Sequence, residues 1–466
     1  MRVNCAKRDR VRDGQSLSVL LSVWGYRILL LLVMTVCVGK LDVLQITFRT
    51  GGCLSLMAVY AIGLMLLQKV YHACDIGQAR VSDLVMSQAL AAVISASVMY
   101  MGAALYLHEL FNPLGLMTAV AVQILLGVAW SVTNNKSYFK YRRKPRTVVI
   151  CQDEAEYEQL CMTSYFFDRY DVIRVITEPT EDIPALRAQL DGSEVVFTLN
   201  LPSTFAHRVA KLCLEMGIVG YFVPRLGHII MAGAQFRSGF SVPLLRVERA
   251  GSHSEYRFFK RAMDIVCSLL GLIVLSPLML ATAIAIKAED RGPVFYRQVR
   301  LTKNGRKFNI LKFRSMTVNA EQDGIARLAG ENDSRITKVG HFIRACRIDE
   351  LPQLINILLG DMSIVGPRPE RPEIACQYEE TLPEFSLRLQ VKAGLTGLAQ
   401  VYGRYNTEPA NKLQMDLMYI NEMSMLKDLQ LILATIKILF VKDSTQGIAQ
   451  GQETALRTDA PQKKSA

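Results

Sequence analysis

Two adjacent carboxylates stand out in the segment RIDELPQL, where Asp349 and Glu350 are followed by a proline and the apolar stretch INILL. Successive helical residues point about 100° apart, so neighbouring acids can have different roles. An aspartate can attack a phosphoryl group, and a glutamate can bind Mg²⁺ together with substrate phosphates. The structural alternative is that Asp349 caps a helix, with Glu350 and Pro352 in its first turn. Both interpretations stay open at this point.

Basic residues of the same region are suited to phosphate. Residues 291–316 contain eight Lys or Arg and no acid. The alternation in KFNILKFR predicts a strand on which Lys312 and Arg314 face the same way, a pair suited to a diphosphate. The segment GPRP places Arg368 between two prolines, which would preorganise it for a bidentate phosphate contact. A solvated basic ribbon and a surface proline loop are the structural alternatives.

Other kinds of active site find little support. The ten cysteines include no CxxC pair, and the six histidines show no HExxH or similar spacing. Zinc and a disulfide framework are therefore not expected, and cysteines within apolar runs suit a reducing compartment. Half of the residues are hydrophobic and the net charge is +12, which favours a membrane protein with anionic lipid or phosphorylated partners. Nucleic acid is not an expected partner.

The elements that must hold these residues begin with an apolar block, residues 17–135, after a basic N-terminus, residues 1–16. Its apolar segments are near the ~20 residues that a spanning helix needs, and they cover 17–39, 50–70, 84–107 and 113–132. Arg27 lies within the first and must snorkel, pair or mark a shorter span. Basic residues precede the first segment and follow the fourth, which places both ends of the block in the cytoplasm.

Residues 145–245 alternate between two kinds of segment. TVVI, VIRVI, VVFTL and GYFVP are typical of buried strands, and EAEYEQLCMTSYF, PALRAQL and TFAHRVAKLCLEM of amphipathic helices. The alternation predicts a small parallel α/β domain, Rossmann-like or CoA-binding-like. The turn after its first strand, CQDEAEY, has no glycine and several acids. We therefore expect a degenerate domain with a structural or regulatory role rather than a dinucleotide site.

A fifth apolar run, residues 258–288, is interrupted by Ser276-Pro277 near its middle. Proline removes one backbone hydrogen bond, and serine can satisfy the freed carbonyl. The run is either a kinked spanning helix or a re-entrant hairpin. Basic residues at both ends favour the hairpin, because both ends would then lie at the anionic cytoplasmic surface. The polar tail, residues 443–466, is expected to be disordered.

The candidate residues occur in an ordered series of motifs. Residues 258–442 read KRAMD, SP, GPVFYRQVR, KFRSM, RITKVG, RIDELPQL, GDMSIVGPRP, KAGLTGLAQVYGR and MDLMYI. This series resembles the bacterial sugar transferases, monotopic phosphoglycosyl transferases that act on polyprenyl phosphate. The preceding spans and α/β domain resemble the long members associated with exopolysaccharide assembly. The resemblance implies a multi-pass protein of the bacterial inner membrane with a cytoplasmic, mixed α/β catalytic domain over residues 255–442 and a re-entrant helix.

The resemblance also implies a reaction. A UDP-sugar gives its hexose-1-phosphate to undecaprenyl phosphate and releases UMP, through a phosphosugar–aspartyl intermediate. Glucose is the first expected sugar and galactose the second, and membrane lipids and a second copy of the chain are further expected partners. Asp349 would be the nucleophile and Glu350 the Mg²⁺ ligand, with Lys312 and Arg368 beside them. The expected substrate-binding residues are Arg314, Arg404 and Asp416, and Ser276-Pro277 matches the break of the family's re-entrant helix.

Two departures and two alternatives accompany this resemblance. Arg347-Ile348 stands where the family often has Ser-Leu, and Ala393 stands where a proline often precedes Gly-Ile-Thr-Gly. Arg347 could therefore alter phosphate or sugar contacts. An inactive membrane scaffold or regulator is one alternative function, which the intact Asp349 and Glu350 oppose. A glycosyltransferase that moves the sugar alone and releases UDP is the other, and the lack of a DxD motif opposes it.

Overall fold

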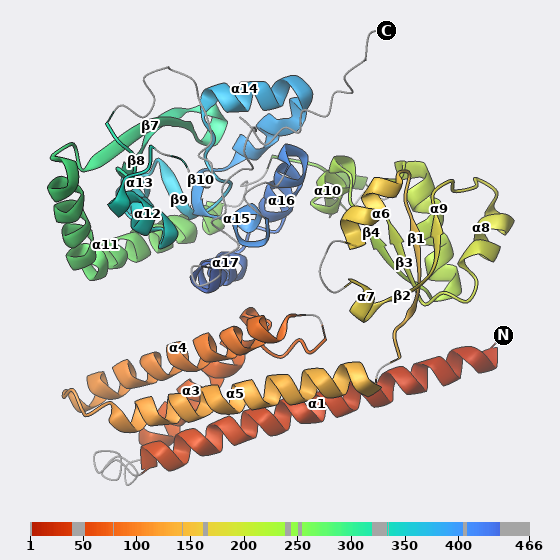
Figure 1. Ribbon diagram of the computed structural model, residues 1–466, viewed down its shortest axis with the longest axis horizontal. Helices are drawn as coiled ribbons and strands as arrows, with labels where there is room; N and C mark the ends of the chain where they lie inside the picture. The colour runs from red at the N-terminus through yellow and green to blue at the C-terminus, as the bar shows by residue number, and fades with distance from the viewer. Residues whose placement is uncertain are drawn as a thin grey trace. The chain divides into compact units, whose positions relative to one another are not determined.

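The computed structural model describes residues 2–39, 52–77, 79–141, 143–161, 166–237, 244–249, 254–318, 333, 335–403 and 408–438. The chain divides into two compact units, Met1–Val223 and Pro224–Ala466 (Figure 1). Residues 224–245, expected in the α/β domain, thus belong to the second unit. The predicted disorder of the tail and the predicted role of Arg404 concern positions outside the described residues.

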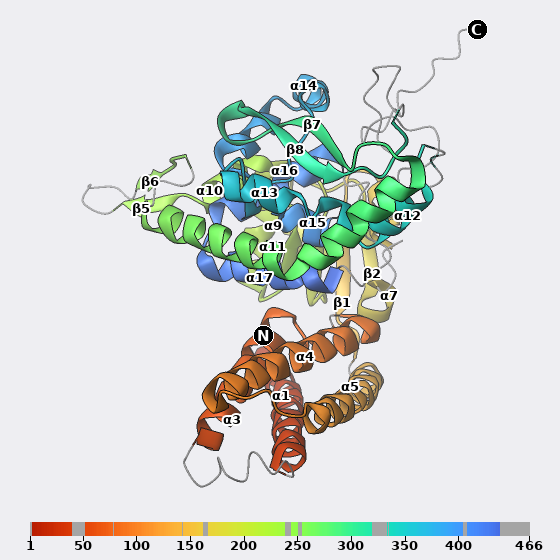
Figure 2. The ribbon, with the colours of Figure 1, turned by 90° about the vertical axis from the view of Figure 1, so that its left-hand side faces the viewer.

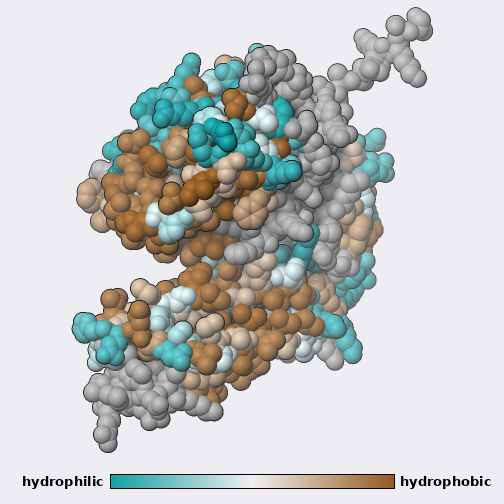
Figure 3. Space-filling view, turned by 60° about the vertical axis from the view of Figure 1, so that its left-hand side comes forward, coloured by the Kyte–Doolittle hydropathy of each residue, from teal (hydrophilic) through white to brown (hydrophobic). Residues whose placement is uncertain are grey.

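The first unit begins with the four predicted apolar helices. They are α1 (Arg2–Gly39), α3 (Gly52–Val70), α4 (Val81–Leu107) and α5 (Leu114–Tyr141). In α1, α4 and α5 the segments Ser18–Cys37, Val81–Tyr106 and Leu114–Lys140 are long and apolar enough to cross a membrane, whereas α3 holds a shorter apolar helix, Leu54–Val70. Hydrophobic side chains spread over the outer faces of these helices (Figure 3). Helix α1 also includes most of the segment expected as a basic N-terminus.

Paired polar side chains link these helices internally. The Tyr26 hydroxyl donates to Gln88 Oε1 at 2.9 Å, and the Tyr60 hydroxyl donates to Gln123 Oε1 at 2.8 Å. Arg27 donates from Nε to Gln68 Oε1 at 3.0 Å. Unpaired polar groups are costly in a hydrocarbon environment, so such pairs also specify which helices are neighbours. Of the options for Arg27, pairing is the one found.

The α/β part of this unit has the predicted parallel sheet. Its strands are β1 (Arg146–Ile150), β2 (Asp171–Ile176), β3 (Val195–Thr198) and β4 (Val219–Phe222), in the order β2-β1-β3-β4. All three pairings are parallel. The helices are α6 (Glu154–Cys161), α7 (Phe166–Arg169), α8 (Ile183–Leu190) and α9 (Ser203–Met216). Apolar strand residues such as Val148 and Val196 form a buried core with Leu186 of α8 and Val209 of α9.

The second unit is a mixture of helices and short strands. It begins with α10 (Leu226–Ala232), the antiparallel pair β5 (Gln235–Arg237) and β6 (Leu244–Arg246), and α11 (Ser254–Asp290). The antiparallel pair β7 (Phe295–Leu301) and β8 (Lys307–Phe313) flanks the short η1 (Lys303–Gly305). Then follow α12 (Lys338–Ala345), η2 (Ile348–Glu350), α13 (Gln353–Leu359), β9 (Met362–Val365), α14 (Pro372–Thr381), η3 (Pro383–Gln390), β10 (Ala393–Thr396), α15 (Leu398–Tyr402), α16 (Pro409–Asn421) and α17 (Met425–Ile438).

The core of this unit joins elements that lie far apart in the chain. Strands β9 and β10 pair in parallel. Phe308 and Ile310 of β8, Ile357 of α13, Tyr378 of α14 and Leu413 of α16 are buried together. The alternation of KFNILKF thus produces the predicted strand, whose buried side chains fix the sheet to α13.

Helix α11 is continuous from Ser254 to Asp290, with Pro277 inside it. Figures 1 and 2 show that it bends, so its two arms run in different directions. Pro277 cannot donate to the carbonyl of Ile273, and the Ser276 hydroxyl donates to that oxygen instead, at 2.8 Å. Proline is a recognised cause of sharp helix kinks, and the predicted role of the serine is confirmed.

Both arms of α11 contact the rest of the second unit. In the first arm, Arg261 donates to the Ile357 and Leu358 carbonyls at 2.6 and 2.7 Å, and Asp264 accepts from the Ile364 amide at 3.0 Å. In the second arm, Glu289 accepts from the Lys338 amide at 2.8 Å. Ile286 is buried with Phe313 and Ile343. The side chains that remain exposed on the helix are largely apolar, among them Ile273, Val274, Leu280 and Ile284.

Candidate active site

The acid pair lies in the tight turn η2, directly before α13. Arg347, which precedes it, has the left-handed backbone conformation φ 53°, ψ 23°, which is uncommon outside glycine. The N-caps of η2 and α13 are Arg347 and Pro352, not Asp349, and within the described residues neither position has a capping hydrogen bond from a side chain. The capping interpretation of Asp349 is therefore wrong.

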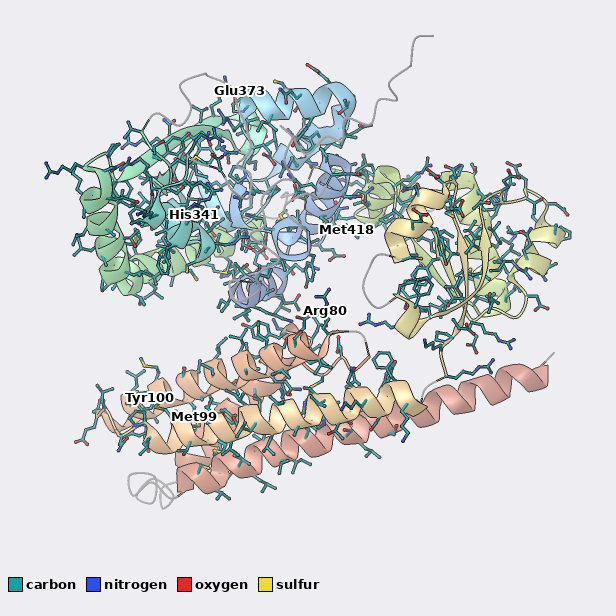
Figure 4. The ribbon with its side chains drawn as sticks, in the orientation of Figure 1. Arg80, Met99, Tyr100, His341, Glu373 and Met418 are labelled. Carbon is teal, nitrogen blue, oxygen red and sulfur yellow. The ribbon has the colours of Figure 1, made fainter. Side chains whose placement is uncertain are left out.

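Glu350 is the meeting point of three segments. Its Oε1 accepts from Lys312 Nζ of β8 at 3.2 Å and from Arg368 Nη2 of the GPRP segment at 2.9 Å. Figure 4 draws the side chains and labels His341 on α12, which precedes η2 in the chain, and Glu373 on α14, which follows the GPRP segment. Burial by itself raises the pKa of Glu350, but the charges of Arg368 and Lys312 outweigh it and hold the pKa below its ordinary value.

Asp349 has the opposite electrostatic character. Burial, with the neighbouring charge of Glu350, raises its pKa to about 6, although Lys312, Arg344 and Arg368 act against the rise. Burial also lowers the pKa of Lys312. Two adjacent carboxyls with pKa values displaced in opposite directions are typical of a site where the two groups have different roles. The more basic carboxylate, Asp349, is the better nucleophile of the pair.

The GPRP segment is held by its backbone. The Pro367 carbonyl accepts from the Gly394 amide at 2.9 Å, and the Glu370 carbonyl accepts from the Leu301 amide at 3.0 Å. Between them, the Arg368 carbonyl accepts from Arg388 Nη2 at 2.8 Å and the Pro369 carbonyl from Arg300 Nη1 at 3.1 Å. Four consecutive carbonyls are thus engaged, so the backbone of this loop is fixed from Pro367 to Glu370.

Glycine is required where this segment begins. A Cβ on Gly366 would lie 2.4 Å from the Lys392 carbonyl oxygen, a distance that real side chains do not show. The Gly366 amide donates to the Thr396 carbonyl at 2.8 Å. This close approach lets the loop continue directly from β9 while it stays bonded to the end of β10.

The structure does not bring every predicted residue to the acid pair. Strand β8 ends at Phe313, and the Arg314 side chain pairs with Asp290 of α11 and donates to the Pro293 carbonyl at 2.7 Å. The expectation that Arg314 forms a cation pair with Lys312 is thereby corrected. Asp416 lies on α16, where its side chain is 2% exposed and forms an ion pair with Arg388 at 2.7 Å. Arg404 lies outside the described residues.

Sequence inspection missed Arg388, Arg300 and Glu370. Arg388 lies within the unremarkable segment FSLRLQ, in η3. Its contacts with Arg368 and Asp416 span 20 and 28 positions of the chain, so no local pattern announces them. The sequence does offer two weak signals, because Glu370 lies two residues after Arg368 and Arg300 belongs to the basic segment 291–316.

The acid pair also limits the kind of metal site. Within the described part of the chain, no group of three or more His, Cys, Asp or Glu side chains could hold a metal ion. Mg²⁺ usually takes one or two protein carboxylates and completes its shell with water and substrate phosphates. Both described contacts of Glu350 fall on Oε1, so Oε2 is the oxygen that suits such an ion. The donor set therefore fits Mg²⁺ bound with substrate.

The comparisons with known proteins concern this unit. The bacterial sugar transferase family matches residues 255–442. Over 187 residues the chain is 43% identical to the UDP-N-acetylgalactosamine-undecaprenyl-phosphate N-acetylgalactosaminephosphotransferase of Aeromonas hydrophila, covering 40% of this chain and 44% of that protein. Over 191 residues it is 44% identical to the UDP-glucose:undecaprenyl-phosphate glucose-1-phosphate transferase of Klebsiella pneumoniae, covering 40% and 41%.

A third relative is shorter. The UDP-glucose:undecaprenyl-phosphate glucose-1-phosphate transferase of Caulobacter vibrioides is 42% identical over 190 residues, which are 40% of this chain and 71% of that protein. The match thus spans less than half the length of the Aeromonas and Klebsiella proteins but most of the Caulobacter protein. The family match, residues 255–442, falls within the unit that contains Asp349 and Glu350.

Proposed function

The chain belongs to the bacterial sugar transferase family, and from this we infer that it transfers a hexose-1-phosphate from a UDP-sugar to undecaprenyl phosphate and releases UMP. The initiating step of exopolysaccharide biosynthesis is the proposed setting. The observation that carries the proposal is the meeting of Lys312, Glu350 and Arg368 beside Asp349. Such a site has a nucleophile, an anion that can hold a cation, and two positive charges for phosphate groups.

The proposed reaction has two displacements at phosphorus. A carboxylate oxygen of Asp349 attacks the phosphorus that bears the sugar, and the bond to the bridging oxygen breaks, so UMP leaves with the electron pair. A phosphate oxygen of undecaprenyl phosphate then attacks the phosphosugar–aspartyl intermediate, which frees the Asp349 carboxylate. With a pKa of about 6, Asp349 is ionised at neutral pH and still more basic than an ordinary aspartate.

The cations serve the leaving group. Lys312 and Arg368 would offset the charge that develops on the phosphates as UMP leaves. Glu350 would hold Mg²⁺ bound together with substrate, and the ion would supply further positive charge to offset that of the phosphates. Because Lys312 and Arg368 both contact Glu350, the protein's own charges are already ordered before substrate arrives.

We propose that α11 is a re-entrant membrane hairpin and that the catalytic unit lies at the cytoplasmic face of the inner membrane. A straight helix of its 37 residues would be about 55 Å long, longer than the ~30 Å hydrocarbon core. Its two ends would then lie on opposite sides of the membrane. The contacts of both arms with one unit, the bend and the exposed apolar side chains support the hairpin instead.

The sugar and the role of the first unit are further proposals. The names of the relatives mention N-acetylgalactosamine, glucose and galactose. We take glucose as the first candidate and galactose as the second. For the parallel α/β domain we propose a structural or regulatory role, because the turn after β1 carries acidic residues and no glycine.

The test is a product assay on the full-length protein in lipid nanodiscs. Undecaprenyl phosphate, Mg²⁺ and a panel of UDP-sugars are supplied, and UMP and UDP are measured separately. We expect UMP with at least one UDP-hexose, loss of the reaction on chelation of Mg²⁺, and a loss of roughly 10³-fold or more in Asp349→Asn. UDP as the nucleotide product would establish transfer of sugar alone, and no product with any UDP-sugar would favour the scaffold.

A further inference from the structure

Arg388 is a buried cation that the proposed reaction does not use. Its side chain is 3% exposed, on η3, with its guanidinium 4.8 Å from the centre of the Phe385 ring. Nη2 donates to the Arg368 carbonyl at 2.8 Å and lies 2.7 Å from Asp416 Oδ2. Nη1 lies 3.5 Å from Glu370 Oε1. One side chain therefore connects the GPRP loop to helix α16.

The charged side chains around Arg388 form ion pairs with one another. Glu370 also pairs with Lys412 of α16 at 3.2 Å, and Asp416 lies one helical turn after Lys412. Glu370 and Asp416 are thus each paired with at least one cation, the condition under which buried charges are tolerated. The Asp416 side chain is 2% exposed and is paired with Arg388, which suits a supporting role better than direct contact with substrate.

The backbone of the GPRP loop leaves one freedom that the contact of Arg388 with the Arg368 carbonyl can remove. The prolines on either side of Arg368 fix their own φ angles, and Pro369 restricts Arg368 to extended conformations. The ψ angle of Arg368 still sets where its carbonyl points and, with it, where its side chain leaves the backbone. The Arg368 side chain is 36% exposed, against 19% for Lys312, so its surroundings restrain it less.

We propose that Arg388 and Asp416 are positioning residues, which hold the Arg368 guanidinium at Glu350 through the Arg368 carbonyl. Asp416 orients Arg388, Arg388 fixes the carbonyl, and the fixed backbone directs the guanidinium to Glu350 Oε1 at 2.9 Å. The inference rests on the proposed function and changes the expected role of Asp416 from substrate contact to support. A displacement of about 1 Å at a catalytic group can cost about 10²-fold in rate.

The experiment compares Arg388→Gln, Arg388→Lys and Asp416→Asn with the wild-type full-length protein. UMP release gives kcat and the KM for the UDP-sugar, and hydrogen exchange of a peptide covering residues 362–371 reports on the loop. For Arg388→Gln we expect kcat to fall about 10- to 100-fold, the KM to change less than about threefold, and the peptide to exchange faster. Arg388→Lys retains the buried charge, so its kcat and its peptide exchange should lie between those of Arg388→Gln and wild type. Asp416→Asn should change both quantities in the same direction as Arg388→Gln, but less.

A matched control separates positioning from general stability. Arg261→Gln removes another arginine that donates to two backbone carbonyls, at the end of α13, and should lower Tm while exchange at 362–371 stays unchanged. Unchanged kcat or unchanged loop exchange in Arg388→Gln would overturn the inference. So would an increase in the exchange of peptide 362–371 in Arg261→Gln as large as that in Arg388→Gln. Absence of UMP from the wild type would instead reject the proposed function. The exchange data would still test whether Arg388 fixes the GPRP loop.

Discussion

Two partly buried glutamates, Glu350 and Glu370, remain charged because each lies between two cations. Lys312 and Arg368 contact Glu350, and Lys412 and Arg388 contact Glu370. For both carboxyls, burial would raise the pKa and the neighbouring charges outweigh it. The same arrangement would therefore serve the proposed chemistry at Glu350 and the support of the GPRP loop at Glu370.

Glu370 gives a pH-dependent prediction. Lys412, Arg388 and Arg300 outweigh the effect of burial and lower its pKa from 4.5 to about 2. A lowered carboxyl pKa stabilises the fold above the unfolded-state value and loses this effect as the pH falls towards the folded-state value. Glu370→Gln leaves the buried Arg388 and the partly buried Lys412 without this counter-charge, and it should cost about 3–5 kcal/mol at neutral pH. Its Tm deficit relative to wild type should narrow between pH 4.5 and 2.

The control for this series is Glu380→Gln, on α14, the helix that follows the GPRP segment. Glu380 is exposed, so its Tm should stay within about 1 °C of wild type at each pH, as for most surface substitutions. A Tm deficit of Glu370→Gln that stays constant or widens in acid would contradict the charge pairing.

At this scale the sequence predicted some contacts and missed others. Adjacent acids, a Lys on a charged strand and an Arg between prolines are each visible locally, and Lys312, Glu350 and Arg368 do meet. The period-two argument failed for Arg314 because β8 ends one residue earlier and Asp290 pairs with it from another element. Buried partners of that kind depend on tertiary structure, which local spacing does not encode.

Among the elements, α11 shows most clearly how a short motif determines a shape. The missing amide of Pro277 and the Ser276 hydroxyl on the Ile273 carbonyl were both readable from two residues. The surroundings of each arm were not, because Arg261, Asp264 and Glu289 bind backbone groups of α12, α13 and β9. The bend is thus local in origin, while its direction is stabilised by tertiary contacts.

Pro277→Ala tests this element. The restored amide can bond to the Ile273 carbonyl, so the helix should straighten, and the two arms can then no longer both bind the catalytic unit. We expect at least a tenfold loss of UMP release. An impermeant thiol reagent applied to spheroplasts provides the structural measurement, since Cys346 and Cys376 of the catalytic unit are exposed.

In the wild type both cysteines should be protected in intact spheroplasts and labelled after lysis. In Pro277→Ala a fraction should become labelled without lysis. Pro113→Ala, at a proline outside the helices, should leave the labelling unchanged. Labelling of wild-type Cys346 in intact spheroplasts would place the catalytic unit on the periplasmic side and refute the hairpin.

For the whole molecule, the division at Val223 and Pro224 separates the proposed chemistry from the first unit. The second unit contains Asp349, Glu350, Lys312 and Arg368 with its own hydrophobic core. It also contains a buried polar cluster in which Asp428 accepts from Lys260 Nζ and the Tyr256 hydroxyl, both at 2.8 Å. The family match, residues 255–442, also lies within this unit.

Residues 224–466 should therefore fold and release UMP without the first unit, at a rate within about tenfold of the full chain. The start of this segment matters, because α10 belongs to its core: Ile229 is buried there, and Asn421 donates to the Ile229 carbonyl at 2.6 Å. Residues 254–466, which lack α10, should have a lower Tm, since removal of a buried isoleucine typically costs about 2–5 kcal/mol. Asp349→Asn in the 224–466 segment is the matched inactive control. A 224–466 segment that is folded but inactive would show that the first unit completes the active site.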